Sequence, residues 1–208
     1  MSNKPKIVYQ SKVQSFYNSI SHFYSLISIV DNKAKNRGIL FSRPKKGDKV
    51  LCIGFGLGEE IKKYNSFGCN TYGLEFSGGM IKSARKKNNL KNIIKGDTFN
   101  LPYRDNSFDI IYSCYMIDIF EKEDTISLLK EMRRTLKQEG KIVSVNNTFE
   151  KGIISKILIK YYLFLKDNIF RRMKTRPIIA TDLFRKAGLK NIKNKKVFWA
   201  SEAVVGFR

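Results

Sequence analysis

The sequence alternates short apolar runs with segments of helical periodicity, and this alternation limits the folds open to the chain. The apolar runs cover residues 50–53, 70–74, 93–94, 108–113 and 142–145, and the helical segments between them cover 57–67, 80–88 and 125–136. Strands that alternate with helices form βαβ units with right-handed crossovers. Two further strands, near Ile192 and over 197–207, fit an antiparallel edge. We therefore expect an α/β fold, with a doubly wound, mostly parallel, seven-stranded sheet, helices on both faces and an antiparallel last strand.

The ends of the chain depart from this rhythm. Apolar residues three and four positions apart over 7–30 predict one or two amphipathic helices, and the basic stretch 36–47 reads as a turn into the first strand. Gly140 is expected to end the helix 125–136, residues 152–173 to form a long aromatic and basic helix, and Gly188 to end a helix over 180–187. The expected organisation is one domain, 1–208. It comprises a helical cap (1–47), a ligand-binding core (48–149), a helical insert (150–176) and a C-terminal helix with strands (177–208).

Positive charge is concentrated at both ends of the sequence. The chain has 40 Lys and Arg against 18 Asp and Glu, a net charge of +22. Residues 1–49 carry 10 bases and 2 acids and residues 141–208 carry 16 and 4, whereas residues 50–140 carry 14 and 12. Such flanks suit an anionic partner, either a membrane surface or a nucleic acid. A compositional bias toward lysine explains them equally well, and the sequence leaves both explanations open.

The cysteines and the hydropathy indicate a cytoplasmic protein. Cys52, Cys69 and Cys114 are odd in number and lie in apolar runs without metal-ligand spacing, so we expect buried thiols and no metal site. No run of eighteen apolar residues and no secretory signal is evident. Attachment to a membrane would then be peripheral.

Three glycines follow the first predicted strand directly and mark the expected ligand site. In open α/β sheets, ligands bind at the carboxyl ends of the strands, where Gly54 and Gly56 would let the backbone approach a ligand and Gly58 would let the next helix pack closely. Glu75 follows 21 residues after Gly54, at the end of the second strand. A carboxylate there can accept hydrogen bonds from both hydroxyls of a ribose.

Two acidic residues argue against a dinucleotide in this site. Glu59 and Glu60 lie at the helix N-terminus, where a dinucleotide would place its pyrophosphate. Two carboxylates oppose a diphosphate, so the ligand should lack phosphates. Adenosine attached to a sulfonium amino acid meets this requirement.

Five motifs in order resemble those of the class I S-adenosylmethionine-dependent methyltransferases, a Rossmann-like family. They are residues 50–59, 74–77, 96–97, 101–109 and 136–145. Within this family the chain is most similar to the ubiquinone/menaquinone-biosynthesis and phospholipid methyltransferases, through residues 101–109, 176–178 and 186–189. The resemblance implies S-adenosyl-L-methionine as cofactor and S-adenosyl-L-homocysteine as product.

The resemblance also assigns roles to residues of the cofactor site. The glycine turn would line the methionyl part, Glu75 would hold the ribose, and Phe76 and Met80 would pack on the adenine. Asp97 and Thr98 would meet the adenine edge, and Ser113 would face the methionine moiety. The full expected set is Gly54, Phe55, Gly56, Gly58, Glu75, Phe76, Met80, Asp97, Thr98 and Ser113. Cys52 departs from the family, which has an acidic residue at this position, so the anchor for the cofactor's amino group is in question.

The acceptor side of the site is less constrained, because methyl transfer depends mainly on proximity and alignment. His22, the single histidine, lies in the predicted cap and is a candidate general base, with Tyr24 as a second catalytic candidate. Tyr17, Tyr24 and Tyr115 are expected to line the acceptor pocket. Packing within a helix would explain each of these cap residues as well.

Three functional hypotheses follow. The first is methylation of a small or lipid-like acceptor, a quinone precursor or phospholipid head group, with the helix 152–173 lying on an anionic bilayer or covering a pocket. The second is methylation of RNA or protein through the basic flanks, although no recognised RNA-binding module is present. The third is a cofactor-binding accessory subunit without turnover, which Cys52 would favour. The accepting atom and the oligomeric state stay open.

Overall fold

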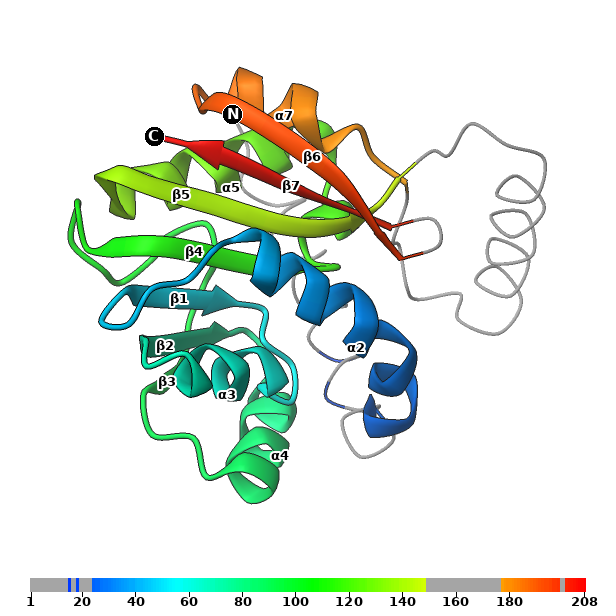
Figure 1. Ribbon diagram of the computed structural model, residues 1–208. Helices are drawn as coiled ribbons and strands as arrows, with labels where there is room; N and C mark the ends of the chain where they lie inside the picture. The colour runs from blue at the N-terminus through cyan, green and yellow to red at the C-terminus, as the bar shows by residue number, and fades with distance from the viewer. Residues whose placement is uncertain (1–14, 16–17, 19–23, 149–176, 199–200) are drawn as a thin grey trace.

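The computed structural model describes residues 15, 18, 24–148, 177–198 and 201–208, with only the backbone described over 24–31. A seven-stranded sheet in the order β3-β2-β1-β4-β5-β7-β6 forms its centre (Figure 1). β1 to β5 pair in parallel, and β7 runs antiparallel to both β5 and β6. This confirms the predicted fold class. The strands are β1 Lys49–Ile53, β2 Asn70–Glu75, β3 Ile93–Lys95, β4 Phe108–Cys114, β5 Leu136–Asn147, β6 Lys190–Phe198 and β7 Ser201–Phe207.

Helices cover both faces of the sheet, as the alternating pattern predicts (Figure 1). On one face lies α2, which packs with apolar residues of α3 and α4 over one hydrophobic cluster; α5 and α7 contribute to a second cluster on the other face. Within β1, Val50 and Cys52 join the first cluster and Leu51 and Ile53 the second, because successive side chains of a strand point to opposite faces. The helices are α2 Tyr24–Phe41, α3 Glu59–Ser66, α4 Gly78–Asn88, the 3₁₀ helix η1 Ile117–Ile119, α5 Lys122–Thr135 and α7 Ala180–Lys186.

Three predicted boundaries were wrong. α2 continues to Phe41 through the first part of the stretch predicted as a turn, because Ile39 in it and Ala34 before it are buried in the cluster under the helix. α5 ends at Thr135 rather than at Gly140, and β5 begins immediately with the extended Leu136. The predicted strand 197–207 is divided, since β6 ends at Phe198 and β7 begins at Ser201.

α2 lies directly on the sheet at a glycine. A Cβ atom on Gly38 would lie 2.3 Å from Cγ2 of Val145, so only glycine allows this approach. Nearby, the hydroxyl of Tyr112 in β4 donates a hydrogen bond of 3.0 Å to the carbonyl oxygen of Lys35. These contacts fix the described part of the predicted N-terminal cap against β4 and β5.

The three cysteines are free and buried, as predicted. Burial, followed by the nearby Glu60 carboxylate, raises the pKa of the Cys52 thiol well above its ordinary value. No helix in the described residues has the length and apolar character needed to cross a bilayer. The predicted insert 150–176 lies outside the described residues, as do Tyr17 and His22.

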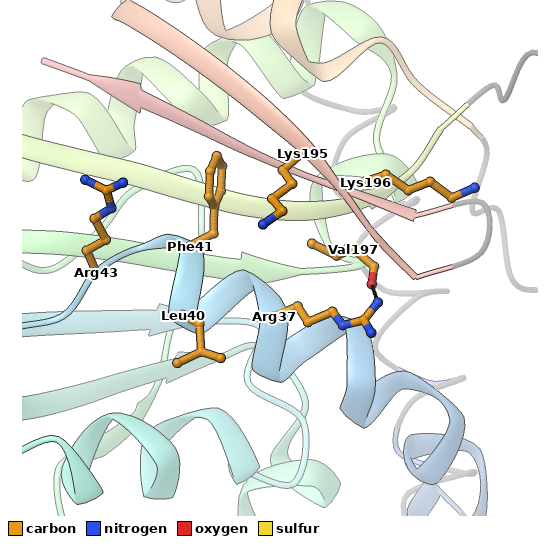
Figure 2. Close-up of a pocket in the computed structure, with 7 residues that line it drawn as sticks. All are labelled: Arg37, Leu40, Phe41, Arg43, Lys195, Lys196 and Val197. Carbon is orange, nitrogen blue, oxygen red and sulfur yellow. Dashed lines mark hydrogen bonds between the residues drawn. The ribbon is translucent and has the colours of Figure 1, made fainter.

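A cleft of about 530 Å³ opens between the C-terminal half of α2 and β6 (Figure 2). Its lining residues do not include any of the predicted site residues.

Candidate active site

The glycine turn begins directly after β1, at the carboxyl edge of the parallel strands. Gly54, Gly56 and Gly58 have φ angles of 64°, 54° and 82°, in the left-handed region that favours glycine. Added Cβ atoms would lie 2.8 Å from Cγ of Met116 at Gly54 and 2.3 Å from Cδ1 of Leu90 at Gly58. Both backbone conformation and space therefore require glycine at these two positions.

The carboxylate of Glu75 connects the end of β2 to the glycine turn. Its Oε2 accepts a hydrogen bond of 3.1 Å from the amide of Gly56, and its Oε1 accepts bonds of 2.9 Å from the amides of Phe76 and Ser77. Burial raises the pKa of Glu75, and the three amides act in the opposite direction. The structure thus brings Glu75 and the glycine turn together, as the topology predicts.

The turn between β2 and α4 holds two more predicted residues. Phe76 is half-buried, whereas Met80 is fully buried and its amide donates to the N-capping hydroxyl of Ser77 at 3.1 Å. Asn18, which the sequence analysis missed, accepts hydrogen bonds from the Ser77 hydroxyl at 2.7 Å and from the Gly79 amide at 2.9 Å. A residue of the N-terminal segment therefore lies beside the Glu75 turn.

Asp97 and Thr98 follow β3 at the same edge. The Oδ1 atom of Asp97 accepts a hydrogen bond of 2.9 Å from the amide of Phe99, and Thr98 is buried. The ring of Phe99 packs edge-on against Phe120 with centroids 5.1 Å apart. These contacts stabilise the start of the loop from β3 to β4.

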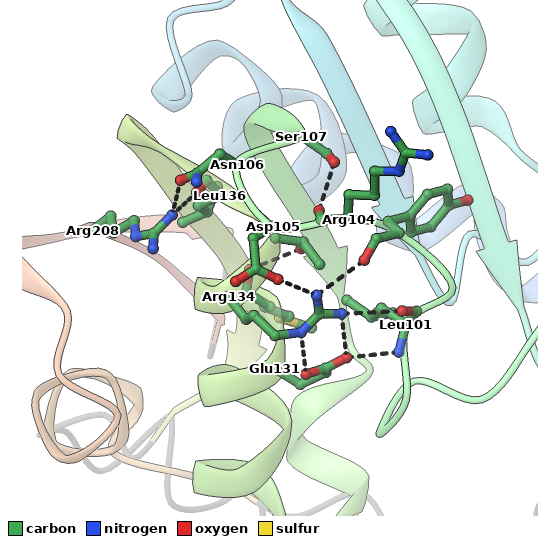
Figure 3. A network of polar contacts seen from close by, with 12 residues as sticks. Leu101, Arg104, Asp105, Asn106, Ser107, Glu131, Arg134, Leu136 and Arg208 are labelled. Atoms are coloured by element: carbon green, nitrogen blue, oxygen red, sulfur yellow. Dashed lines mark hydrogen bonds and ion pairs between the residues drawn. The ribbon is translucent and has the colours of Figure 1, made fainter.

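The guanidinium of Arg134 in α5 fixes the rest of this loop (Figure 3). It donates to both carboxylate oxygens of Glu131, to the carbonyl oxygens of Leu101 and Tyr103, and to Asp105 at 2.5 Å. The hydrogen bonds from Arg134, the larger influence, outweigh burial and lower the pKa of Glu131. The motif 101–109 is therefore held in place from α5.

The end of β4 gathers a further group of predicted residues. Ser113 is buried, and its hydroxyl lies 2.9 Å from that of Ser144 on β5. Tyr115 has a φ of 49°, unusual for a residue other than glycine, and its hydroxyl lies 2.8 Å from that of Ser201. Met116, which the sequence analysis missed, lies against Gly54. The sequence signal for Met116 was its position three residues after the end of the predicted strand 108–113.

The side chain of Phe55, unlike the backbone of the three glycines, does not belong to the ligand-facing part of the turn. Its ring is 2% exposed, and ring atoms lie 2.7 Å from the place that a Cβ of Gly73 would occupy. The side chain therefore packs in the core beneath β2. Of the predicted acceptor-side residues, the structure describes Tyr115 fully and only the backbone of Tyr24, at the start of α2.

Both acidic residues at the start of α3 are paired with lysines. Glu59 lies 3.0 Å from the ammonium of Lys87, and Glu60 lies 3.0 Å from that of Lys35. These pairs partly neutralise the charge that argues against a diphosphate. The spacing G-x-G-x-G, which differs from the G-x-G-x-x-G of dinucleotide folds, thus carries more of the case for a phosphate-free nucleoside.

Comparison with known proteins places the chain in a family. Residues 51–144 match a profile described as a methyltransferase domain. An uncharacterized methyltransferase of Geobacillus sp. is 30% identical over 168 residues, which cover 77% of this chain and 79% of that relative. This chain belongs to the methyltransferase family. In keeping with the motifs above, it is a class I enzyme and uses S-adenosylmethionine as methyl donor.

Two further relatives of this methyltransferase carry a more specific name. The demethylmenaquinone methyltransferase of Staphylococcus carnosus is 28% identical over 216 residues, 89% of this chain and 88% of the relative. That of Corynebacterium kroppenstedtii is 33% identical over 99 residues, which span 48% of this chain and only 42% of the relative. A solved SAM-dependent methyltransferase from Thermotoga maritima shares the fold. Its TM-score is 0.73 at 21% identity, with 92% of this chain and 97% of that chain covered.

The residues of the methyltransferase site fit this cofactor. Gly54, Gly56 and Gly58 add no side chains of their own at this edge, and Oε2 of the buried Glu75 carboxylate, which accepts from one amide, retains a lone pair for a ribose hydroxyl. Cys52 is the one departure. It lies in the apolar cluster under α2, and the charge of Glu60 acts on it electrostatically. A carboxylate at position 52 would therefore face a second buried carboxylate.

Proposed function

We propose that this enzyme transfers the methyl group of S-adenosylmethionine to a small, lipid-like acceptor of the quinone-precursor class. The observation that carries the proposal is the match, over nearly nine tenths of both chains, to a relative named demethylmenaquinone methyltransferase. A phospholipid head group is a lipid-like acceptor of a second kind, and no observation in the described residues favours it.

When bound, the cofactor supplies a methyl group on a positively charged sulphur. The acceptor would take up this methyl group through an electron pair of its accepting atom and lose one proton, and the pair of the former carbon–sulphur bond would stay on the sulphur of the product. The protein has to align the two reactants, exclude water and receive that proton.

We assign the cofactor side of this task to the carboxyl edge of the sheet. Gly54, Gly56 and Gly58 would carry the methionyl part, and Oε2 of Glu75 would accept a hydrogen bond from a ribose hydroxyl. Their geometry supports this, because the Gly56 amide already holds the carboxylate of Glu75 at the turn. Phe76, which is half-buried, would pack against the adenine.

Four further residues would contribute to the cofactor pocket, two through polar contacts and two through its wall. Asp97 and Thr98 would meet the adenine edge from the loop that Arg134 holds. Met80 and Ser113 are fully enclosed, so they would shape the pocket wall rather than touch the ligand through polar atoms.

The acceptor would approach from the side of Tyr115 and the N-terminal cap. Tyr17 and Tyr24 would line its pocket, and His22 would receive the proton. Asn18 supports the placement of the cap, since it contacts the turn that follows Glu75. The net charge of +22 further supports action near an anionic surface.

Incubation with radiolabelled cofactor tests the function. Demethylated quinone, total lipid, RNA and protein fractions would each be offered, with the Glu75→Ala variant as the inactive control. We expect label in the quinone or the lipid fraction with the native protein alone. Label confined to RNA or protein would replace this proposal by the polyanion hypothesis. Cofactor binding without label in any fraction would indicate an accessory subunit.

A further inference from the structure

The cleft between α2 and β6 carries a charge that the methyl-transfer site does not explain. Arg37 and Arg43 line it from α2 and the turn that follows, and Lys195 and Lys196 line it from β6 (Figure 2). All four side chains are exposed, and the lining residues in the described part of the chain include no carboxylate. Arg37, Arg43 and Lys195 surround a volume of about 530 Å³ and favour an anionic occupant, whereas Lys196, the next residue of the strand, borders the cleft with its ammonium directed away from Lys195 (Figure 2).

One of the cations is oriented by a neutral group. Arg37 donates a hydrogen bond to the carbonyl oxygen of Val197 on β6, which joins the two walls of the cleft. This contact positions the guanidinium without cancelling its charge. Lysines on an exposed edge strand such as β6 also discourage strand pairing between molecules. Edge protection does not require the two arginines of the opposite wall, so it does not explain the whole group.

The cleft also has an apolar component. Leu40 is 57% exposed, one of the large apolar side chains that the described surface leaves in water, and Phe41 beside it is half-buried. Cations gathered around an exposed leucine match the interface of an anionic bilayer, which offers phosphates and acyl chains together. A nucleic acid would use the cations alone, because a single half-buried ring does not provide a stacking platform.

We propose that this cleft is a docking site for an anionic phospholipid surface, with Arg37, Arg43 and Lys195 on the head-group phosphates and Leu40 entering the acyl boundary. It deepens the membrane association suggested above. It does not depend on which acceptor is methylated, since none of its residues belongs to the glycine-turn site.

Sedimentation with vesicles tests the docking site. The full-length protein is mixed with vesicles of phosphatidylcholine alone or with phosphatidylglycerol. The paired variant Arg43→Glu with Lys195→Glu is compared with Lys86→Glu with Lys91→Glu, which changes the net charge equally at two exposed positions in and beside α4. We expect binding only with phosphatidylglycerol. The variant pair in the cleft should weaken vesicle binding at least about tenfold, and the control pair should weaken it far less. Leu40→Gln should weaken the fraction of vesicle binding that persists at high salt.

Equal losses of vesicle binding in the two paired variants would overturn the proposal, because they would show that the vesicles respond only to the net charge of the protein. Vesicle binding that survives in the cleft pair would also overturn it, and loss of single-stranded RNA binding in the same variant would then assign the cleft to nucleic acid. Methylation of a detergent-solubilised acceptor is measured in parallel and should be unchanged by the cleft pair. Failure of the proposed acceptor is thereby distinguished from failure of the docking site.

Discussion

Lys35 of α2 and Glu60 of α3 form a buried ion pair, with Nζ and Oε1 3.0 Å apart and side chains only 6% and 3% exposed. Because Glu60 follows the glycine turn by two residues, the pair joins the N-terminal helix to the first turn of the helix that presents the candidate cofactor site. Removal of Lys35 leaves the Glu60 carboxylate buried without this cation. Its energetic consequence is therefore larger than that of a surface ion pair.

The first prediction concerns this pair. Glu60→Leu or Lys35→Met alone should lower the free energy of unfolding by about 3–5 kcal/mol, because each breaks a buried ion pair. The combined variant Lys35→Met with Glu60→Leu should recover most of that loss. Urea denaturation of the four proteins measures this coupling. Additive losses in the combined variant would contradict it.

The second prediction concerns Cys52, which is 1% exposed and lies within the electrostatic influence of Glu60. Cys52→Asp should destabilise the protein, since it places a second carboxylate near the first. Addition of Glu60→Gln should relieve part of this loss, because Lys35 can then neutralise the new acid. A double-mutant cycle in thermal unfolding gives the interaction energy. An interaction energy near zero would show that the two positions are independent.

Third, Gly38→Ala should release α2 from the sheet. The new methyl group would lie 2.3 Å from the Val145 side chain, so we expect a loss of about 1–3 kcal/mol although alanine favours helices. Gly78→Ala is the matched control, because no atom lies within 4 Å of its Cβ position and its φ is not in the left-handed region. The control should match or slightly exceed the native stability. Equal unfolding temperatures for both variants would disprove the tight contact.

Fourth, Glu75→Ala should weaken binding of S-adenosylmethionine by roughly ten- to a hundredfold, the effect of losing a charge-assisted hydrogen bond. It also leaves the amides of Gly56, Phe76 and Ser77 without their carboxylate acceptor, so stability should fall as well. Calorimetric titration at a temperature well below unfolding separates the two effects. Unchanged affinity would remove Glu75 from the cofactor site.

The fifth prediction concerns acid sensitivity at the Arg134 cluster. The hydrogen bonds from Arg134 lower the folded-state pKa of Glu131. The stabilisation is therefore complete above the unfolded-state value of about 4.3 and is lost as pH falls through the lower folded-state pKa. Glu131→Gln should cost on the order of 1 kcal/mol at neutral pH, reduced by solvent screening, and flatten the stability profile below about pH 4.3. A profile as steep as that of the native protein would refute this role.

The sequence predicts the strands of this fold well and their boundaries less well. The runs around Val50 and Ile110 are apolar enough to indicate strands buried on both faces. Gly140 misled the prediction, because a glycine after a helical pattern usually marks a C-cap. Here it lies inside β5, where a Cβ would be 3.0 Å from the carbonyl oxygen of Phe108. Backbone crowding of this kind depends on a neighbouring strand and leaves no periodic signal.

The residues of the candidate site also divide into those that the sequence could predict and those that it could not. Glu75 and the glycines were predictable because topology places both at one sheet edge, and the structure brings them within hydrogen-bonding distance. Asn18 was not predictable, since its contact with Gly79 joins segments distant in sequence, and the sequence signal for Met116 was limited to its position after a strand end. His22 and Tyr17 lie outside the described residues and remain predictions.

The position of β7 has a consequence for synthesis of the chain. Residues 201–207 lie between β5 and β6, so they fill the interior of the sheet although they come last in sequence order. During translation, the hydrogen-bonding edge of β5 stays open until these residues leave the ribosome. A nascent chain stalled before Ser201 would expose the backbone of Lys141 to Asn147 to chaperones or to neighbouring polypeptides.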